Sequence, residues 1–300
     1  MEFSTKVEIK PSDWRIAPCE RMLFIGSCFA DNIGQRFVAD RFRATVNPYG
    51  VMYNPASILH TVERLIESHA MLFTADEQGT AVFTLGTNHV YILKATGEIV
   101  DNCNKQPQRL FREEKLSIEQ CAGYLRQAVL LIHRHYPKVR FVLTVSPIRY
   151  RKYGYHGSQL SKATLLLAID RLIEEYKSTP VNDALSPDTK GAGAASGNHP
   201  APAIDYFPSY EIVNDELRDY RFYQPDMLHP TAQAVDYIYE KFSSAYFSPD
   251  TFRFLEAWEP IREALGHRPL HPDSEAYRQF KAKTEAQLQA LRDRYPMMGE

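Results

Sequence analysis

The chain has 300 residues, of which 44% are hydrophobic, and a formal net charge of −2 at neutral pH. A chain of this length and composition can bury a large core, and we expect one domain with an appendage rather than two equal domains. No cluster of lysine and arginine is dense enough to dominate phosphate binding, which excludes nucleic acid and anionic membranes as main partners. We expect the partner to be a small molecule or a glycan.

We expect neither a signal peptide nor a membrane span from the sequence pattern. Charges are scattered through the first ten residues, where a signal peptide needs an unbroken apolar stretch, and no run approaches the roughly 18 apolar residues of a membrane span. These features predict a cytoplasmic protein with no membrane contact. The four cysteines, at positions 19, 28, 103 and 121, form no Cys-x-x-Cys pair and are expected to be buried thiols rather than disulfides or zinc ligands. We expect no metal and no cofactor, and the sequence leaves the oligomeric state open.

The first predicted elements are a strand over residues 22–25 and a helix directly after it. Phe29, Ile33 and Phe37 recur at four-residue spacing, so they are expected to share the buried face of this helix. The helix N-terminus then points at Ser27 and favours negative charge that develops there.

Further strands are predicted over 82–85, 90–93 and 139–145. The last is a continuous apolar run, which is typical of a buried parallel strand. Ser117 and Gln120 resemble a capping box that opens the helix leading into it. Two more amphipathic helices are expected, over residues 160–176 and 230–242.

This alternation of strands and helices predicts a three-layer α/β/α sandwich around a central parallel sheet in residues 1–249. Residues 178–204 form a polar, small-residue stretch without periodicity, which predicts a mobile surface loop, either a lid over the site or a plain insertion. Residues 250–300 are expected to form a helical C-terminal extension. Its role is left open between bracing the core and making an oligomer contact.

The residues that carry chemistry lie in two short segments. Ser27 stands where the first strand breaks at Gly26 and a helix begins, and Asp226 and His229 stand three positions apart before Pro230. A serine hydroxyl is a weak nucleophile that needs a base, and histidine can take its proton near neutral pH and return it. In an Asp-x-x-His turn the carboxylate can reach the Nδ1–H of the ring, which leaves Nε2 free for the serine. The pattern predicts a nucleophile, a base and an orienting acid.

Four further segments accompany these blocks in a fixed order: 47–55, 85–88, 144–149 and 206–211. Together they resemble the SGNH (GDSL-like) hydrolases, and more closely their GSCFA branch, whose name is spelled by residues 26–30. The resemblance covers residues 20 to 245 and implies a flavodoxin-like fold. It also implies an oxyanion hole made by the N–H groups of Ser27 and Gly50 and the amide of Asn88. Such donors are worth about 3–4 kcal/mol each.

The chain departs from the SGNH pattern at two of these blocks. No acidic residue precedes Ser27, and the asparagine block lacks its usual following acid. Asn54 and Asn102 are alternatives to Asn88, because each offers a neutral amide donor on a predicted loop. Cys28 is a rival nucleophile, but adjacent side chains on such a turn diverge, so we expect a packing role for it.

Arg149 follows the end of a predicted strand, where it would hold a substrate carboxylate or form a structural ion pair. The whole pattern predicts a serine-dependent acyl-ester hydrolase, and the resemblance implies that it removes a short acyl group, such as acetyl, from a carbohydrate or other small polar substrate. Two alternatives remain open. One is an O-acyltransferase with the same acyl-enzyme, and the other is a binding protein of this fold without turnover.

Overall fold

The computed structural model describes residues 4–70, 73–101, 103, 106–178 and 201–298. The loop predicted over 178–204 falls mainly outside these residues, and so does Asn102.

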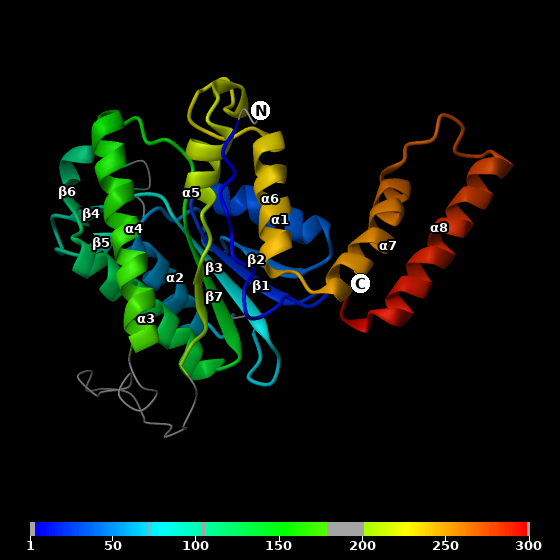
Figure 1. Cartoon of the computed structure of the whole chain (residues 1–300), viewed down its shortest axis with the longest axis horizontal. Coiled ribbons are helices and arrows are strands. Elements are labelled where there is room, and N and C mark those ends of the chain that lie inside the picture. The colour runs from blue at the N-terminus through cyan, green and yellow to red at the C-terminus, as the bar shows by residue number, and fades with distance from the viewer. Residues whose placement is uncertain (1–3, 71–72, 102, 104–105, 179–200, 299–300) are drawn as a thin grey trace.

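The centre of the molecule is a sheet of five parallel strands in the order β2-β1-β3-β7-β8. The strands are β1 (Arg21–Gly26), β2 (Arg43–Val46), β3 (Gly79–Leu85), β7 (Val139–Val145) and β8 (Ile204–Tyr206). Helices cover both faces of the sheet (Figure 1). The three-layer α/β/α sandwich with a central parallel sheet is therefore confirmed.

Side chains of β1 explain how the two helical layers are held. Leu23 and Ile25 point into a core shared with α2 (Pro55–Glu67), α3 (Ile118–His135) and α4 (Gly154–Ser178). Met22 and Phe24 point the other way, into a core shared with α1 (Cys28–Ala39) and α6 (Ala232–Tyr246). Successive side chains of a strand alternate between faces, so one apolar strand can hold both layers. The predicted buried faces of α1 and α3 are confirmed.

A second, antiparallel sheet lies between β3 and α3 in the chain. It contains β4 (His89–Leu93), β5 (Ile99–Val100) and β6 (Phe111–Lys115) in the order β5-β4-β6. The strand predicted over 90–93 is thus present, but it lies outside the main sheet. The short elements are α5 (Ser209–Glu211), the π-helix Ile212–Leu217 and the 3₁₀ turns Gln108–Leu110, Tyr220–Phe222 and Pro296–Met298.

Helix starts were predicted with mixed success. The capping box of Ser117 and Gln120 is present. The helix predicted from Pro230 begins two residues later, with Thr231 as its N-cap. Pro230 instead forms an isolated bridge with Tyr223, which keeps it in the loop.

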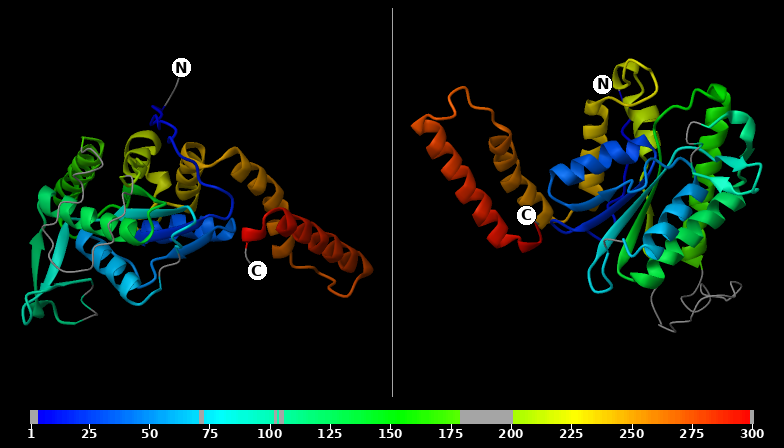
Figure 2. Two further views of the ribbon diagram at one scale, coloured as in Figure 1. Left: turned by 90° about the horizontal axis from the view of Figure 1, so that it is seen from below. Right: turned by 180° about the vertical axis from the view of Figure 1, so that it is seen from behind.

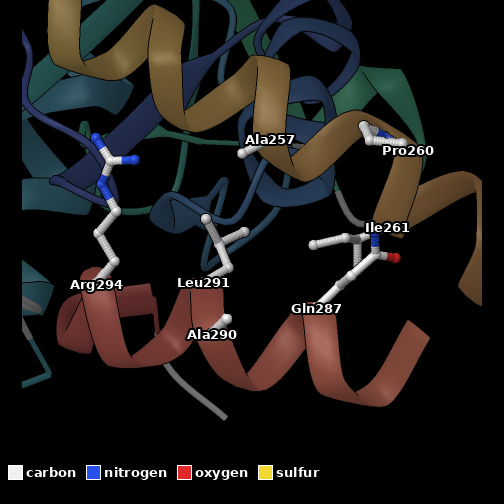
Figure 3. Close-up of a pocket in the computed structure, with 7 residues that line it drawn as sticks. All are labelled: Ala257, Pro260, Ile261, Gln287, Ala290, Leu291 and Arg294. Atoms are coloured by element: carbon white, nitrogen blue, oxygen red, sulfur yellow. The ribbon is translucent and has the colours of Figure 1, made fainter. Parts of the chain in front are cut away.

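The C-terminal extension is helical, as predicted. Helices α7 (Pro249–Gly266) and α8 (Glu275–Arg294) form a hairpin that projects from the α/β body (Figure 2). The indole of Trp258 donates to the Ala39 carbonyl at 2.8 Å, and Arg262 pairs with Asp40, so α7 is attached to the end of α1. A groove of about 470 Å³ runs between the two helices (Figure 3).

Cys19 and Cys121 are buried free thiols, and burial raises the pKa of each to about 12. The expected thiol state is thus confirmed for these two residues. Across the described part of the chain, we find no group of three histidine, cysteine or acidic residues that could hold a metal ion. None of the described helices combines the length and the apolar character that a membrane crossing requires.

Candidate active site

Ser27 lies where β1 passes into α1, as the sequence predicts. It is the N-cap of α1, and its Oγ accepts a hydrogen bond from Phe29 N at 3.3 Å. The preceding Gly26 has φ = 153°, and a Cβ added there would lie 2.2 Å from the Thr84 carbonyl oxygen. Only glycine therefore allows β1 and β3 to approach this closely just before the serine. Ser27 is 2% exposed.

The segment after β2 holds this junction in place. Oδ1 of Asn47 accepts a hydrogen bond from Gly26 N at 2.8 Å, and its Nδ2 donates to Oδ1 of Asp31 at 2.6 Å. Met52 N donates to the Gly26 carbonyl, also at 2.8 Å. Both backbone groups of Gly26 are thus bonded to residues 47–52. The sequence predicted no role for Asn47 or Asp31, and the one signal was that Asp31 lies in the predicted helix after Ser27 and Asn47 begins segment 47–55.

Gly50 lies in the same segment, four residues after β2 ends. It is exposed, with φ = 91°. Its backbone N–H donates to the Asn47 carbonyl at 2.8 Å, which closes a turn. Gly50 therefore follows the end of the strand next to β1, and its N–H is engaged within the turn.

Asn88 follows β3, the strand on the other side of β1. Its Nδ2 donates to the Leu116 carbonyl at 2.8 Å, and its backbone N–H donates to Oγ of Ser161 at 3.0 Å. The amide is 5% exposed, and its Oδ1 is buried without a hydrogen-bond partner among the described residues. The Asn88 side chain is therefore hydrogen-bonded towards the second sheet, because Leu116 directly follows β6.

Asn54 is the N-cap of α2. Its Oδ1 accepts from Ser57 N at 3.0 Å, whereas its Nδ2 has no hydrogen-bond partner within the described ranges. The adjacent Tyr53 carbonyl accepts from the N–H groups of Gly86 and Thr87, each at 2.8 Å. These bonds tie the start of α2 to the loop after β3. A Cβ added at Gly86 would lie 3.6 Å from Cβ of Ser27, so this loop runs directly beside the serine.

The predicted acid–base pair is formed in the loop before α6. Nδ1 of His229 lies 2.5 Å from Oδ2 of Asp226. Oδ1 of the same carboxylate accepts from the backbone N–H groups of Leu228 and His229, at 2.9 and 3.0 Å. Because the backbone bonds from Leu228 and His229 and the imidazole stabilise its charged form, the pKa of Asp226 is lowered to about 2.

Arg149 joins the loop after β7 to this acid–base loop. Its backbone N–H donates to the Leu228 carbonyl at 3.1 Å, and Nη1 donates to the Met227 carbonyl at 3.3 Å. The guanidinium lies over the ring of Tyr155, 4.3 Å from its centroid. In the described part of the molecule Arg149 has no carboxylate partner, so the structural ion pair that the sequence left open is not formed there.

Cys28 has its Sγ 3.8 Å from the Tyr53 hydroxyl. The Tyr53 ring packs edge-on against Tyr150, with centroids 6.1 Å apart, and Tyr150 stacks on Tyr153. The thiol therefore contacts a row of half-buried tyrosines.

The structure brings the predicted residues to the carboxyl-end edge of the sheet, where ligand sites of open α/β folds form. Ser27 follows β1, Gly50 follows β2 and Asn88 follows β3, while the 226–229 loop is bonded to the loop after β7. Within the described residues, Ser27 and His229 make no hydrogen bond with each other. Of the three residues predicted as a triad, Asp226 and His229 are bonded to each other, whereas the Ser27 hydroxyl caps α1.

Comparison with known families finds two models that match the chain. One, described as the GSCFA family, matches residues 21–79 and 73–242, and the other, described as the C-terminal domain of GSCFA domain proteins, matches residues 258–298. No curated protein matches this chain.

Two solved structures are similar at low identity. One is a Streptococcus pneumonia protein provisionally described as a platelet activating factor, with 14% identity, a TM-score of 0.43, and coverage of 76% of this chain and 84% of that chain. The other is an acetyl xylan esterase from the rumen bacterium Butyrivibrio proteoclasticus, with 9% identity, a TM-score of 0.35, and coverage of 80% and 64%. Neither similarity is strong enough to bear on the chemistry of this chain.

Proposed function

The chain belongs to the GSCFA family, and from this premise we propose that it is a serine-dependent ester hydrolase of the SGNH type. The observation that carries the proposal is the bond between His229 and Asp226, 2.5 Å long, in a loop attached to the carboxyl-end edge of the sheet where Ser27 also lies. A carboxylate bonded to Nδ1 selects the tautomer in which Nε2 can accept a proton.

The proposed reaction proceeds through an acyl-enzyme. As Oγ of Ser27 bonds to the ester carbonyl carbon, Nε2 of His229 takes the hydroxyl proton. The tetrahedral intermediate expels the alcohol, which leaves with that proton. Water then attacks the acyl carbon as Nε2 of His229 takes its proton, the bond between the acyl carbon and Oγ of Ser27 breaks, and His229 returns the proton to Oγ as the acid is released. Asp226 keeps its charge throughout and stabilises the imidazolium.

Developing charge on the carbonyl oxygen needs hydrogen-bond donors. The N–H groups of Ser27 and Gly50 donate to the carbonyls of Thr84 and Asn47 in this structure, at 3.2 and 2.8 Å, so the oxyanion must compete with these acceptors. The N-terminus of α1 contributes positive potential at the same place.

We favour Asn54 over Asn88 as the amide donor of the oxyanion hole, because Nδ2 of Asn54 has no hydrogen-bond partner within the described residues. Nδ2 of Asn88 is already bonded to the Leu116 carbonyl. Asn54 also follows Tyr53, whose carbonyl binds the Gly86 loop beside Ser27.

The burial of Ser27 has a mechanistic consequence. At 2% exposure, its hydroxyl must be uncovered, and its bond with Phe29 N given up, before it can meet a substrate and His229. The same burial supports O-acyl transfer as a second candidate, because a site that excludes water protects an acyl-enzyme from hydrolysis. A short acyl group on a carbohydrate or other small polar molecule is the proposed substrate class for either reaction.

Turnover of 4-nitrophenyl acetate tests the proposal. Hydrolysis by the wild type that is lost in both Ser27→Ala and His229→Ala, and retained in Cys28→Ala, supports serine catalysis. A burst of nitrophenol that continues only when a sugar acceptor is added supports transfer. Equal turnover in the wild type and Ser27→Ala would contradict both.

A further inference from the structure

A small cavity lies beside the candidate active site. Its volume is about 60 Å³, and it is lined by the loop after β7, the first turns of α4, α5 and the π-helix that follows α5. A polar space of this size holds a few water molecules or one compact polar group. The residues that matter for its chemistry are Arg149, Gln159, Lys162, Tyr210 and Asn214.

Two cationic side chains and no acidic one are found among the described residues that line this cavity. Lys162 is 2% exposed, and its Nζ donates to the carbonyls of Gly86 and Ser146, at 2.8 and 2.7 Å. An ammonium group has three protons, so these two acceptors leave one donor. No carboxylate pairs with Lys162 in the described part of the chain.

Glu211 and Asp215 are the acidic residues whose charge acts on Tyr210, a residue that lines the cavity, and neither forms a salt bridge with Arg149 or Lys162 in the described chain. Glu211 accepts hydrogen bonds from the hydroxyl of Tyr206, at 2.7 Å to each carboxylate oxygen. Asp226 is bonded to the imidazole and two backbone N–H groups of its own loop. Within the described residues, neither Arg149 nor Lys162 therefore forms a salt bridge with a carboxylate.

A buried cation without a counter-charge is costly, and the cost is relieved when an anion binds. Burial lowers the pKa of Lys162 to about 7, whereas the carbonyl bonds favour its charged form. An anion in the cavity would therefore draw a proton onto Lys162. The Arg149 guanidinium supplies several fixed donors suited to two oxygens of one group.

We propose that this cavity is a subsite for a compact oxyanion, a carboxylate or phosphate group, held by Arg149 and Lys162. The assignment of this oxyanion to an ester substrate rests on the proposed function. The connections to the site are direct: Lys162 binds the carbonyl of Gly86, beside Ser27, and Arg149 binds the carbonyl of Leu228, next to His229. An ester that carries an acidic group would thus be selected over a neutral one.

Direct binding tests the subsite without any need for turnover. Titration of the full chain with inorganic phosphate, and separately with acetate, is measured by calorimetry for the wild type, Arg149→Gln and Lys162→Met. The matched controls are Arg151→Gln and Lys177→Met, which remove the same charges at exposed positions two residues further along the same loop and at the end of α4.

We expect saturable binding in the wild type and in both controls, weakened at least about tenfold in each subsite variant, the loss expected for one charge-assisted bond. Near pH 8, binding should take up a proton, seen as a heat that depends on the buffer, and Lys162→Met should abolish this uptake. The ion that binds more tightly, phosphate or acetate, shows whether the subsite takes a phosphate or a carboxylate group.

Equal affinity in the wild type and Arg149→Gln, or no saturable binding of either ion, overturns the proposal. Arg149 lies at a half-exposed position, so Arg149→Gln keeps the test decisive if Lys162→Met fails to fold.

An ester pair separates the two proposals. The ratio of kcat/KM for 4-nitrophenyl hemisuccinate to that for 4-nitrophenyl acetate should fall at least about tenfold in Arg149→Gln relative to Arg151→Gln. An unchanged ratio contradicts the role of the subsite in substrate selection. Phosphate binding without turnover of either ester leaves the anion subsite intact and contradicts the hydrolase.

Discussion

Oδ1 of Asn47 accepts a hydrogen bond from the backbone N–H of Gly26 at 2.8 Å, one residue before the candidate nucleophile. Asn47 has φ = 41°, a conformation that asparagine adopts more readily than most residues. Through its Nδ2 it also binds Asp31 in the first turn of α1. One side chain therefore fixes the end of β1 to the start of α1, with Ser27 between them.

Replacing Asn47 by alanine should weaken both the fold and the site. The change leaves the buried Gly26 N–H without its acceptor, which costs about 1–3 kcal/mol in the free energy of unfolding. Urea denaturation of Asn47→Ala measures this loss, and ester turnover should fall with it. Asn32→Ala, at the residue that follows Asp31 in α1, is the control and should change stability by less than about 0.5 kcal/mol. Equal stability of the two variants would contradict the role of Asn47.

Asp226→Asn tests the orientation of the imidazole. The amide keeps the shape of the carboxylate but no longer enforces the tautomer with Nε2 free, so kcat should fall by about 100- to 10,000-fold with little change in fold. Steady-state kinetics with 4-nitrophenyl acetate measure the fall. A kcat within a few-fold of the wild-type value would contradict a triad that includes this acid.

The lowered pKa of Asp226 also predicts a stability effect in acid. A carboxyl group whose pKa is about 2 when folded, and near 4 when unfolded, stabilises the fold above pH 4 and loses this contribution as the pH falls through 2. The stability difference between wild type and Asp226→Asn should therefore be present near pH 6 and vanish towards pH 2. Thermal unfolding of both proteins across this range is the measurement.

The lowered pKa of Lys162 predicts a second pH dependence of stability, in the alkaline range. Its pKa is about 7 when folded and 10.5 as the ordinary value, so the unfolded chain binds more protons between these limits. The wild type should gain stability relative to Lys162→Met as the pH rises from about 7 to about 10. Urea midpoints of the two proteins at several pH values measure this. A constant difference would show that Lys162 stays charged throughout, and would contradict a lowered pKa.

The two candidate amide donors can be separated by substitution. Asn54→Asp retains an oxygen that can cap α2 but replaces the Nδ2 donor with negative charge, so stability should hold while kcat falls about 100- to 1,000-fold. Asn88→Ala should lose stability, because it leaves the buried Leu116 carbonyl without its donor. Circular dichroism melts and ester kinetics on both variants give the comparison. The reverse pattern would assign the donor to Asn88.

The spacing of apolar residues predicted most of the helices and strands, because this spacing depends on the local geometry of each element. The spacing of Phe29, Ile33 and Phe37 indicates one buried helix face, and the apolar run 139–145 indicates a strand covered on both sides. The second sheet was not predicted as a separate sheet, since the pairing of β4 with β6 joins residues that are distant in sequence, such as His89 and Lys115.

Parts of the candidate site depend on tertiary contacts that no local pattern shows. Lysine in an amphipathic helix normally faces solvent, yet Lys162 is buried, because the carbonyls of Gly86 and Ser146 accept its hydrogen bonds. The orientation of the Asn88 amide and the hydrogen bond between Asn47 and Gly26 likewise depend on partners distant in sequence. The Asp226–His229 pair was predictable because both residues lie in one short turn.

The measurement that tests the central claim most directly is intact-mass analysis after exposure to a fluorophosphonate. An activated serine attacks phosphorus and expels fluoride, so the folded wild type should gain the mass of one phosphonyl group. The adduct should be absent in Ser27→Ala, form much more slowly in His229→Ala, and form normally in Cys28→Ala. No adduct on folded wild-type protein, or an adduct that persists in Ser27→Ala, would contradict serine catalysis at this site.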